Sequence, residues 1–145
     1  MLLKIKKLNS LAKTPAYGSA GSAGADLYAA TDSPTFIAAG ETAFIGTGIA
    51  VEIPEGYVGL VYARSGLACK KGLAPANKVG VIDADYRGEI KVAVHNHSSS
   101  GQTVDAGERI AQLVVAPFLK CEFTETDELS DTVRGKGGFG STGNL

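Results

Sequence analysis

Two aspartates, a tyrosine and an arginine occupy the segment from Asp83 to Arg87, between two apolar runs. Asp83 directly follows Ile82, so its carboxylate stands at the end of a predicted buried strand rather than at the tip of a loop. A carboxylate held rigidly in that place can act as a general base. Tyr86 lies three residues further on, where its ring can pack against a sugar. Aspartate and glycine are also common in hairpin turns, which leaves a purely structural role open.

A second group of chemically useful residues begins at Arg64, directly before the only good helix candidate of the chain, the one or two turns over residues 65–71. Ser65 can cap this short helix, a lysine pair favours its C-terminal end, and Gly72 can stop it. The first N–H groups of a helix have no intrahelical partner, so a helix start beside an arginine can bind an anion such as phosphate. An ordinary capped turn is the competing interpretation.

Two further polar residues interrupt apolar strand patterns. Asp26 lies among small and apolar residues, where it can serve as a metal-linked group or as a turn cap. The alternation of residues 108–115 places Ile110, Gln112 and Val114 on one predicted inward face. A buried glutamine requires hydrogen-bond partners, and either a ligand or a neighbouring backbone can supply them.

The chain ends in a glycine-rich segment, residues 134–143, with five glycines, two cations, two hydroxyls and one aromatic ring. Such a segment cannot form a core, and glycine has the largest ordering cost of any residue. Its cations and N–H groups suit phosphates, and its ring suits a base. We therefore expect a domain over residues 1–123, followed by a linker and flexible arm over 124–145 that orders on a ligand.

Elsewhere, short runs of period two separated by Gly, Pro, Asn and Asp predict an all-β fold: a sandwich, jelly roll or barrel. In the clearest run, Ile90, Val92 and Val94 share one face. The predicted strands are Leu2–Leu8, Ala43–Ile53, Gly59–Ala63, Val79–Ile82, Glu89–Asn96, Ile110–Ala116 and Leu119–Phe123.

Composition narrows the function classes. A chain of 145 residues with net charge -1 is expected to be one domain without stable nucleic-acid binding, since such binders are basic. Its apolar runs are too short for a membrane span or a signal peptide, so we expect a cytoplasmic protein. Cys69 and Cys121 fit no metal spacing, and reduced thiols are favoured over a disulfide. His95 and His97 are expected to form a packed or interfacial pair rather than a zinc site.

Five segments, taken in order, resemble the trimeric dUTP diphosphatase (dUTPase) family, and Lys136 is the one variation noted. The segments are 23–27, 64–68, 80–88, 107–112 and 134–143. The resemblance implies a jelly-roll-like distorted β-barrel in a homotrimer with active sites at subunit interfaces. The arm of one subunit would close a site built by its neighbours. The implied reaction converts dUTP and water to dUMP and pyrophosphate, limits uracil in DNA and supplies dUMP for thymidylate synthesis, with Mg²⁺ held by the triphosphate.

The resemblance also implies a role for individual residues. Asp83 would activate the attacking water, and Tyr86 would pack against the deoxyribose and exclude a 2′-hydroxyl. Asn77 and neighbouring hairpin backbone, including Val81, would read uracil, while Asp26 would act through water on the metal. The implied phosphate ligands are Arg64, Ser65, Gly66, Gln112 and Arg134. In the arm, Phe139 would cover the base, and Gly140, Ser141 and Thr142 would wrap the γ-phosphate.

Three alternatives remain open from the sequence. A dCTP deaminase shares the implied fold and nucleotide grip, although residues 83–88 look like the phosphohydrolase pattern. A non-catalytic regulatory trimer would keep the pocket and act through a partner. A structural jelly roll would leave the arginine, aspartate and glutamine at turns and strand ends without a purpose.

Overall fold

Strands make up nearly all the regular structure of residues 1–138, the part of the chain that the computed structural model describes. Every strand pair is antiparallel. The elements in chain order are β1 (Lys4–Lys7), β2 (Ala16–Tyr17), β3 (Ala25–Tyr28), β4 (Thr35–Ile37), β5 (Thr42–Gly46), β6 (Ile49–Glu52), β7 (Tyr57–Tyr62), α1 (Ser65–Lys71), β8 (Leu73–Pro75), β9 (Val79–Ile82), β10 (Lys91–Asn96), β11 (Gln102–Val104) and β12 (Arg109–Pro117).

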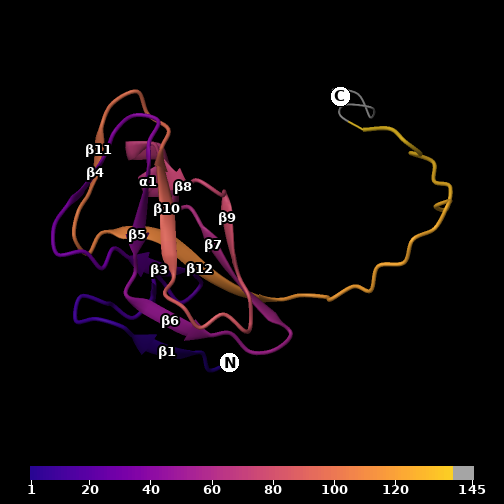
Figure 1. Cartoon of the computed structure of the whole chain (residues 1–145), viewed down its shortest axis with the longest axis horizontal. Helices are drawn as coiled ribbons and strands as arrows, with labels where there is room; N and C mark the ends of the chain where they lie inside the picture. The colour runs from indigo at the N-terminus through magenta and orange to yellow at the C-terminus, as the bar shows by residue number, and fades with distance from the viewer. Residues whose placement is uncertain (139–145) are drawn as a thin grey trace.

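The strands pair mainly with partners distant in the sequence. The largest sheet has the order β2-β3-β12-β7-β9, and a second sheet has the order β5-β10-β8. Two further pairs, β1-β6 and β4-β11, lie beside them (Figure 1). These crossed connections give the distorted, jelly-roll-like barrel that the family resemblance implied, and the described residues place one short helix at one end of it.

The barrel interior follows from the alternation in the strands. Ile90, Val92 and Val94 share one face of the strand, as predicted, and all three are buried, whereas Lys91 on the opposite face of β10 is exposed. They pack in one core with apolar side chains from the large sheet, including Leu113. Burying this alternating set fixes the register of β10, since a slip of one residue would expose it.

The predicted strand Ala43–Ile53 is wrong in one respect: it is two strands, β5 and β6. Gly48 adopts a positive φ of 66°, which ends the extended run. A Cβ at this position would meet Asn9, Ala12 and Ala30 at 2.8–3.0 Å, so the turn also requires glycine for close packing. The break lets β5 pair with β10 and β6 pair with β1.

The predicted inward face of β12 is also wrong. Opposite Tyr28 and Leu27 of β3, the register of β12 steps from Arg109 to Ala111, which marks a β-bulge. The extra residue, Ile110, is buried, and Ala111 and Leu113 then continue the inward face. Gln112 therefore lies on the outer face of the large sheet.

Helix α1 confirms the predicted Ser65–Lys71 segment, including the lysine pair in its last turn and Gly72 as its C-cap. Ser65 is not the N-cap, because Arg64 holds that position, and within the described residues no side chain caps the helix. Its buried side chain is Leu67. In this part of the chain no helix has the length and apolarity required to cross a membrane.

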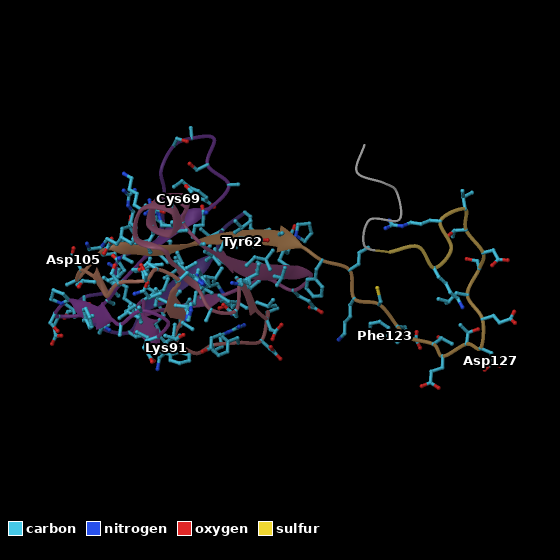
Figure 2. The ribbon with its side chains drawn as sticks, turned by 90° about the horizontal axis from the view of Figure 1, so that it is seen from above. Tyr62, Cys69, Lys91, Asp105, Phe123 and Asp127 are labelled. Carbon is cyan, nitrogen blue, oxygen red and sulfur yellow. The ribbon has the colours of Figure 1, made fainter. Side chains whose placement is uncertain are left out.

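The remaining differences concern short or unpaired segments. β2, β4, β8 and β11 have only two or three residues each, too few for period two to be visible in the sequence. The predicted strand Leu119–Phe123 is absent from the described structure, and both of its apolar ends are more than 90% exposed. After β12 the chain runs away from the barrel through Phe123 and Asp127 (Figure 2).

The two histidines do pack together, with ring centroids 4.4 Å apart in an edge-to-face arrangement. Loss of hydration lowers the pKa of His97 most, and charge on His95 and Lys78 lowers it further. In the described part of the chain Cys69 and Cys121 are both free thiols and exposed. Within residues 1–138 neither pair belongs to a group of three or more potential metal ligands.

The end of α1 generates a stability prediction. Gly72 has a φ of 65°, and a Cβ there would lie 3.0 Å from Ser98 Cβ and 3.1 Å from its backbone nitrogen. Gly72→Ala should therefore lower the free energy of unfolding by about 1–2 kcal/mol, measured by urea titration at fixed protein concentration. Gly66→Ala is the matched control, because a Cβ there meets no atom within 4 Å and alanine favours the helix. Equal stability of the two variants would contradict this account.

Candidate functional site

The segment that runs from β9 to β10, and so links the two larger sheets, lines a pocket of about 420 Å³, here called pocket A. It brings together four of the predicted site residues, which line it along with Gly80 and Ile82. The four are Asn77, Val81, Asp83 and Tyr86. Its lining also includes Phe44, Glu89 and Lys91, which the sequence patterns did not single out. Pocket A thus joins a carboxylate, an amide and an aromatic ring in one cavity.

Hydrogen bonds cross-link the turn that follows β9. The carbonyl of Asp83 accepts the N–H of Tyr86 at 3.2 Å, and Arg87 Nη1 donates to the carbonyls of Ala84 and Tyr86 at 2.6 and 2.9 Å. The Tyr86 hydroxyl donates to the backbone carbonyl of Glu89 at 2.9 Å. The Asp83 side chain is exposed at the end of this braced turn. The carboxylate is therefore carried by a well-defined backbone and remains open to water.

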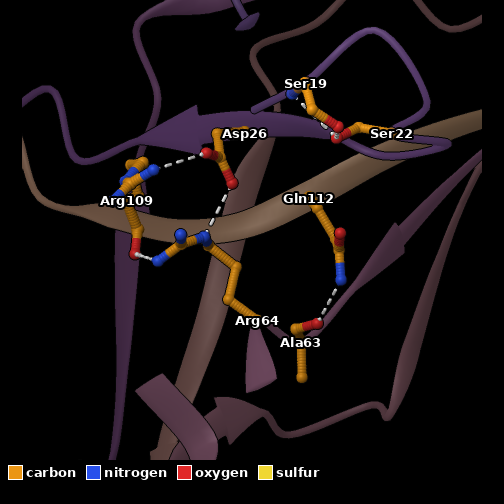
Figure 3. A network of polar contacts seen from close by, with 7 residues as sticks. All are labelled: Ser19, Ser22, Asp26, Ala63, Arg64, Arg109 and Gln112. Atoms are coloured by element: carbon orange, nitrogen blue, oxygen red, sulfur yellow. Dashed lines mark hydrogen bonds and ion pairs between the residues drawn. The ribbon is translucent and has the colours of Figure 1, made fainter. Parts of the chain in front are cut away.

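A second pocket of about 480 Å³, here called pocket B, lies over the outer face of the large sheet. It gathers the other predicted residues of the barrel: Asp26, Arg64, Ser65, Gly66 and Gln112. Its centre is the side chain of Asp26, which is 9% exposed and accepts from two arginines (Figure 3). Arg64 Nε donates to Oδ1 at 2.6 Å, and Arg109 Nη1 donates to Oδ2 at 3.1 Å. Asp26 is thus an anchor for two cations rather than a turn cap.

The Asp26 pair orients Arg64 without using up its hydrogen-bonding capacity. A guanidinium carries five N–H donors. Arg64 uses one in the hydrogen bond to Asp26 and a second in a longer hydrogen bond, at 3.4 Å, to the carbonyl of Arg109. Its remaining donors can bind an anion bidentately. Arg109 was missed by the sequence analysis, although its place directly before the apolar run of β12 was a usable signal.

Gln112 finds its partner in the neighbouring backbone, one of the two possibilities left open by the sequence. Its Nε2 donates to the carbonyl of Ala63 at 2.8 Å (Figure 3). Gly24 makes room for this side chain, because a Cβ at Gly24 would lie 2.5 Å from Gln112 Oε1. The amide therefore braces the chain directly before Arg64 and lines pocket B at the same time.

An ion pair holds the far end of α1. Lys71 Nζ donates to both carboxylate oxygens of Glu108, at 2.8 and 3.0 Å, and to the carbonyl of Thr103 at 2.9 Å. Glu108 in turn accepts the N–H of Asp105 at 2.9 Å. These contacts tie the helix to the turn between β11 and β12, so the exposed Ser65 and Gly66 at its start keep a defined place beside Arg64.

Pocket A lies at the β9 edge of the large sheet, mainly on its inner side, and pocket B lies over its outer face. Val61 lines pocket A and Tyr62 lines pocket B, and consecutive strand residues point to opposite faces. The pairing agrees, since Tyr62 stands opposite Gln112, whereas Val61 stands opposite the buried Leu113. The two halves of the predicted site are therefore separated by a sheet within one chain.

The described part of the glycine-rich arm, residues 134–138, lines neither pocket. Arg134 is exposed and donates from Nε to the carbonyl of Gly137 at 2.9 Å. It lines neither pocket A nor pocket B. Phe139, Gly140, Ser141 and Thr142, predicted to cover the base and wrap the γ-phosphate, lie outside the described residues.

The side chains of pocket B could contact a metal ion only through water or a bound phosphate. Residues 1–138 contain no group of three or more His, Cys, Asp or Glu side chains that could hold an ion. Asp26 is the single carboxylate of pocket B, and both of its oxygens already accept from arginines. A divalent ion bound here would take its direct ligands from a phosphate ligand and water, with Asp26 at most contacting its water shell.

Comparisons with known proteins agree with this geometry. The dUTPase family model matches residues 11–143. The chain is 52% identical over 143 residues to the deoxyuridine 5′-triphosphate nucleotidohydrolase of Nautilia profundicola, with 99% of each chain covered. It is 49% identical over 143 residues to the enzyme of the same name from a Hydrogenobaculum species, again with 99% of each covered.

Solved structures extend the comparison to three dimensions. The dUTPase of Staphylococcus bacteriophage 80alpha, solved with dUPNHPP, superposes with a TM-score of 0.90 at 32% identity over 98% of both chains. A mutant dUTPase of phage phi11 of S. aureus has a TM-score of 0.80 at 27% identity over 88% of this chain and 98% of its own. That structure is described as revealing the coordination of a structural Mg(II) ion. In sequence and in fold, the chain belongs to the dUTPase family.

Proposed function

We propose that this protein hydrolyses dUTP to dUMP and pyrophosphate. The observation that carries the proposal is Asp83, whose open carboxylate directly follows β9 and shares pocket A with Asn77 and Tyr86. Membership of the dUTPase family and the nucleotidohydrolase names of the relatives favour the same reaction. Such an activity would limit uracil in DNA and supply dUMP for thymidylate synthesis, and the proposed compartment is the cytoplasm.

Pocket A is proposed to hold the nucleoside. Asn77 and the hairpin backbone around Val81 would pair with the base edge of uracil, and cytosine would present an inverted donor and acceptor pattern. A narrow hairpin would exclude the extra methyl of thymine by steric clash, because apolar contacts alone discriminate only about 10–200-fold. The Tyr86 ring would pack against the deoxyribose and leave no space for a 2′-hydroxyl.

Pocket B is proposed to hold the phosphates. The unused donors of Arg64 match phosphate oxygens, and the first-turn amides of Ser65 and Gly66 have no intrahelical partner. Gln112 would contribute from the sheet beside them. Asp26 keeps the arginines oriented before the ligand arrives, so little reorganisation is needed on binding.

A homotrimer would join the two pockets into complete sites. Because a sheet separates pocket A from pocket B in one chain, a nucleotide that uses both would require pocket A of one subunit to face pocket B of another. Residues 1–123 would form the barrel, and residues 124–145 would reach a neighbouring site. There, Arg134, Ser141 and Thr142 would contact phosphates, Gly140 would allow close backbone approach, and Phe139 would cover the base.

In the proposed reaction Asp83 accepts a proton from a water molecule as its oxygen attacks the α-phosphorus. The new P–O bond forms as the bond to the bridging oxygen of the β-phosphate breaks, and pyrophosphate leaves with that oxygen. Arg64 and the helix-start amides would offset the negative charge that builds on the phosphates. Mg²⁺ carried by the triphosphate would supply further neutralisation, with Asp26 as the residue of this chain nearest to its water shell.

Asp83→Asn tests the central assignment. The amide keeps the shape of the carboxylate but cannot accept the proton, so pyrophosphate release from dUTP should fall by about 10²–10⁴-fold. The dissociation constant of a non-hydrolysable dUTP analogue, measured by calorimetry, should stay within a few-fold of wild type. Near-normal turnover would remove Asp83 from its role. Ammonia release from dCTP by the wild-type protein would instead indicate a deaminase, and binding without any turnover would indicate a regulatory module.

Mixed trimers test whether the sites are shared. Asp83→Asn and a variant lacking residues 134–145 should each be nearly inactive as homotrimers. If the arm closes a neighbour's site, trimers reassembled from both variants would contain sites with an intact Asp83 and an intact arm, and activity should return to a sizeable fraction of wild type. The matched control mixes Asp83→Asn with itself. No recovery, despite verified mixing by mass spectrometry, would contradict sharing.

Metal removal tests the proposed part of Mg²⁺. EDTA should abolish dUTP hydrolysis and added Mg²⁺ should restore it, while the far-ultraviolet circular dichroism spectrum stays unchanged, because the barrel supplies no direct ligand set within residues 1–138. Asp26→Asn should raise the Mg²⁺ concentration needed for half-maximal activity. Full activity in EDTA would refute a metal requirement.

A further inference from the structure

We propose that Glu89 is a positioning residue for Tyr86, holding the proposed sugar-facing ring against the wall of pocket A. It does so by linking the segment between β9 and β10 to the turn between β5 and β6. This inference rests on the proposed function through the role of Tyr86 in excluding ribose. None of the sequence motifs that resemble the dUTPase family selected Glu89, and it emerged only from the contacts around pocket A.

The first link joins the tyrosine to the backbone of residue 89. The Tyr86 hydroxyl donates to the carbonyl of Glu89 at 2.9 Å, so the far end of the ring is held where that carbonyl lies. The ring also passes directly over Gly88, where an added Cβ would overlap the hydroxyl. Tyr86 is 45% exposed, so the barrel core does not enclose its ring. Any shift of the Glu89 backbone will therefore shift the ring.

The second link joins the side chain of Glu89 to the β5–β6 turn. Its Oε1 accepts the N–H of Gly48 at 2.8 Å in a partly buried position. The carboxylate occupies the space above Gly46, since a Cβ there would lie 2.5 Å from Oε1 and 3.2 Å from the carboxyl carbon. Gly46 has no positive φ, so its lack of a side chain serves this contact rather than the backbone conformation.

Neighbouring contacts hold the fold independently of Glu89. The Ile90 carbonyl accepts from Thr47 Oγ1 at 2.6 Å and from Thr47 N–H at 3.1 Å, and its N–H donates to Ile49 at 2.9 Å. Ile90 itself is 4% exposed. Loss of the Glu89 carboxylate should therefore leave the barrel folded and loosen only residues 86–89. The charged neighbour Lys91 is 3.9 Å from Oε2 at an exposed site, so charge pairing should contribute little.

The functional consequence is loss of discrimination against a ribose. A 2′-hydroxyl would be excluded only while the Tyr86 ring stays close to the sugar, and a displacement well below 1 Å changes such a contact. Glu89→Ala removes the hydrogen bond between Gly48 N–H and the charged carboxylate of Glu89. Because hydrogen bonds to charged groups are stronger than neutral ones, we expect the ratio of kcat/KM for dUTP to kcat/KM for UTP to fall about tenfold. Most of that change should come from faster UTP turnover, with kcat for dUTP little altered.

Four variants test the inference with matched geometry. Glu89→Gln keeps an oxygen that can accept from Gly48 N–H, so its selectivity should remain near wild type. Gly46→Ala should mimic Glu89→Ala by displacing the carboxylate. The double variant Gly46→Ala/Glu89→Ala should be no worse than Glu89→Ala alone, because the clash is gone. Glu41→Ala, an exposed glutamate of the turn before β5, is the control and should change nothing.

A second readout separates this inference from the proposed reaction. The ring resonances of Tyr86, followed by NMR in the unliganded protein, should shift in Glu89→Ala and Gly46→Ala but not in Glu89→Gln. Wild-type protein that releases no pyrophosphate from dUTP would end the proposed function, and the resonances would still test the positioning contact. Unchanged Tyr86 resonances or unchanged selectivity in a folded Glu89→Ala variant would overturn the inference. Equal losses in Glu89→Gln and Glu89→Ala would overturn it as well.

Discussion

A β-strand presents consecutive side chains to opposite faces of its sheet, and the whole arrangement of this protein depends on how β7 and β12 use both faces. Val61 turns to the core side and pocket A, and Tyr62 turns to the outer side and pocket B. The same alternation buries Leu113 and brings Gln112 to the outer face. One sheet therefore supports a nucleoside-shaped cavity and a cationic cavity without letting them meet inside a single chain.

Pocket B shows how a cationic surface can be prepared in advance. Two guanidinium groups that converge on one place would repel, and the Asp26 carboxylate between them offsets that repulsion and fixes their geometry. Because Asp26 is nearly buried and the guanidinium groups are part-exposed, the pair remains polar at its outer edge. The Gln112 amide and the Lys71–Glu108 ion pair then hold the segments on either side of Arg64. These contacts position pocket B and leave several N–H groups of its arginines free to bind a ligand.

The sequence predicted the elements that carry the site better than the faces they present. β9 and α1 have the predicted bounds, and the buried run of Ile90, Val92 and Val94 is confirmed, because each depends on local pattern alone. The sequence assigned the wrong residues of β12 to the inward face, because a β-bulge inserts Ile110 into the strand. Nothing in a regular apolar run marks such an extra residue. Leu119–Phe123 has a strand-like pattern, yet a strand requires a partner edge, and the described residues give it none.

What the sequence determined by itself is the chemical inventory and its order: a carboxylate at a strand end, a cation before a helix, a glycine-rich arm, and the family that these motifs resemble. Which side chains meet was decided by the tertiary structure. Asp26 and Arg109 lie 83 residues apart in the chain, and their contact exists only because β3 pairs with β12. The carboxylate of Glu89 above Gly46 likewise requires two distant turns to pack together. Local patterns report backbone preference and burial, whereas contacts between distant segments follow from register, bulges and packing of the complete barrel.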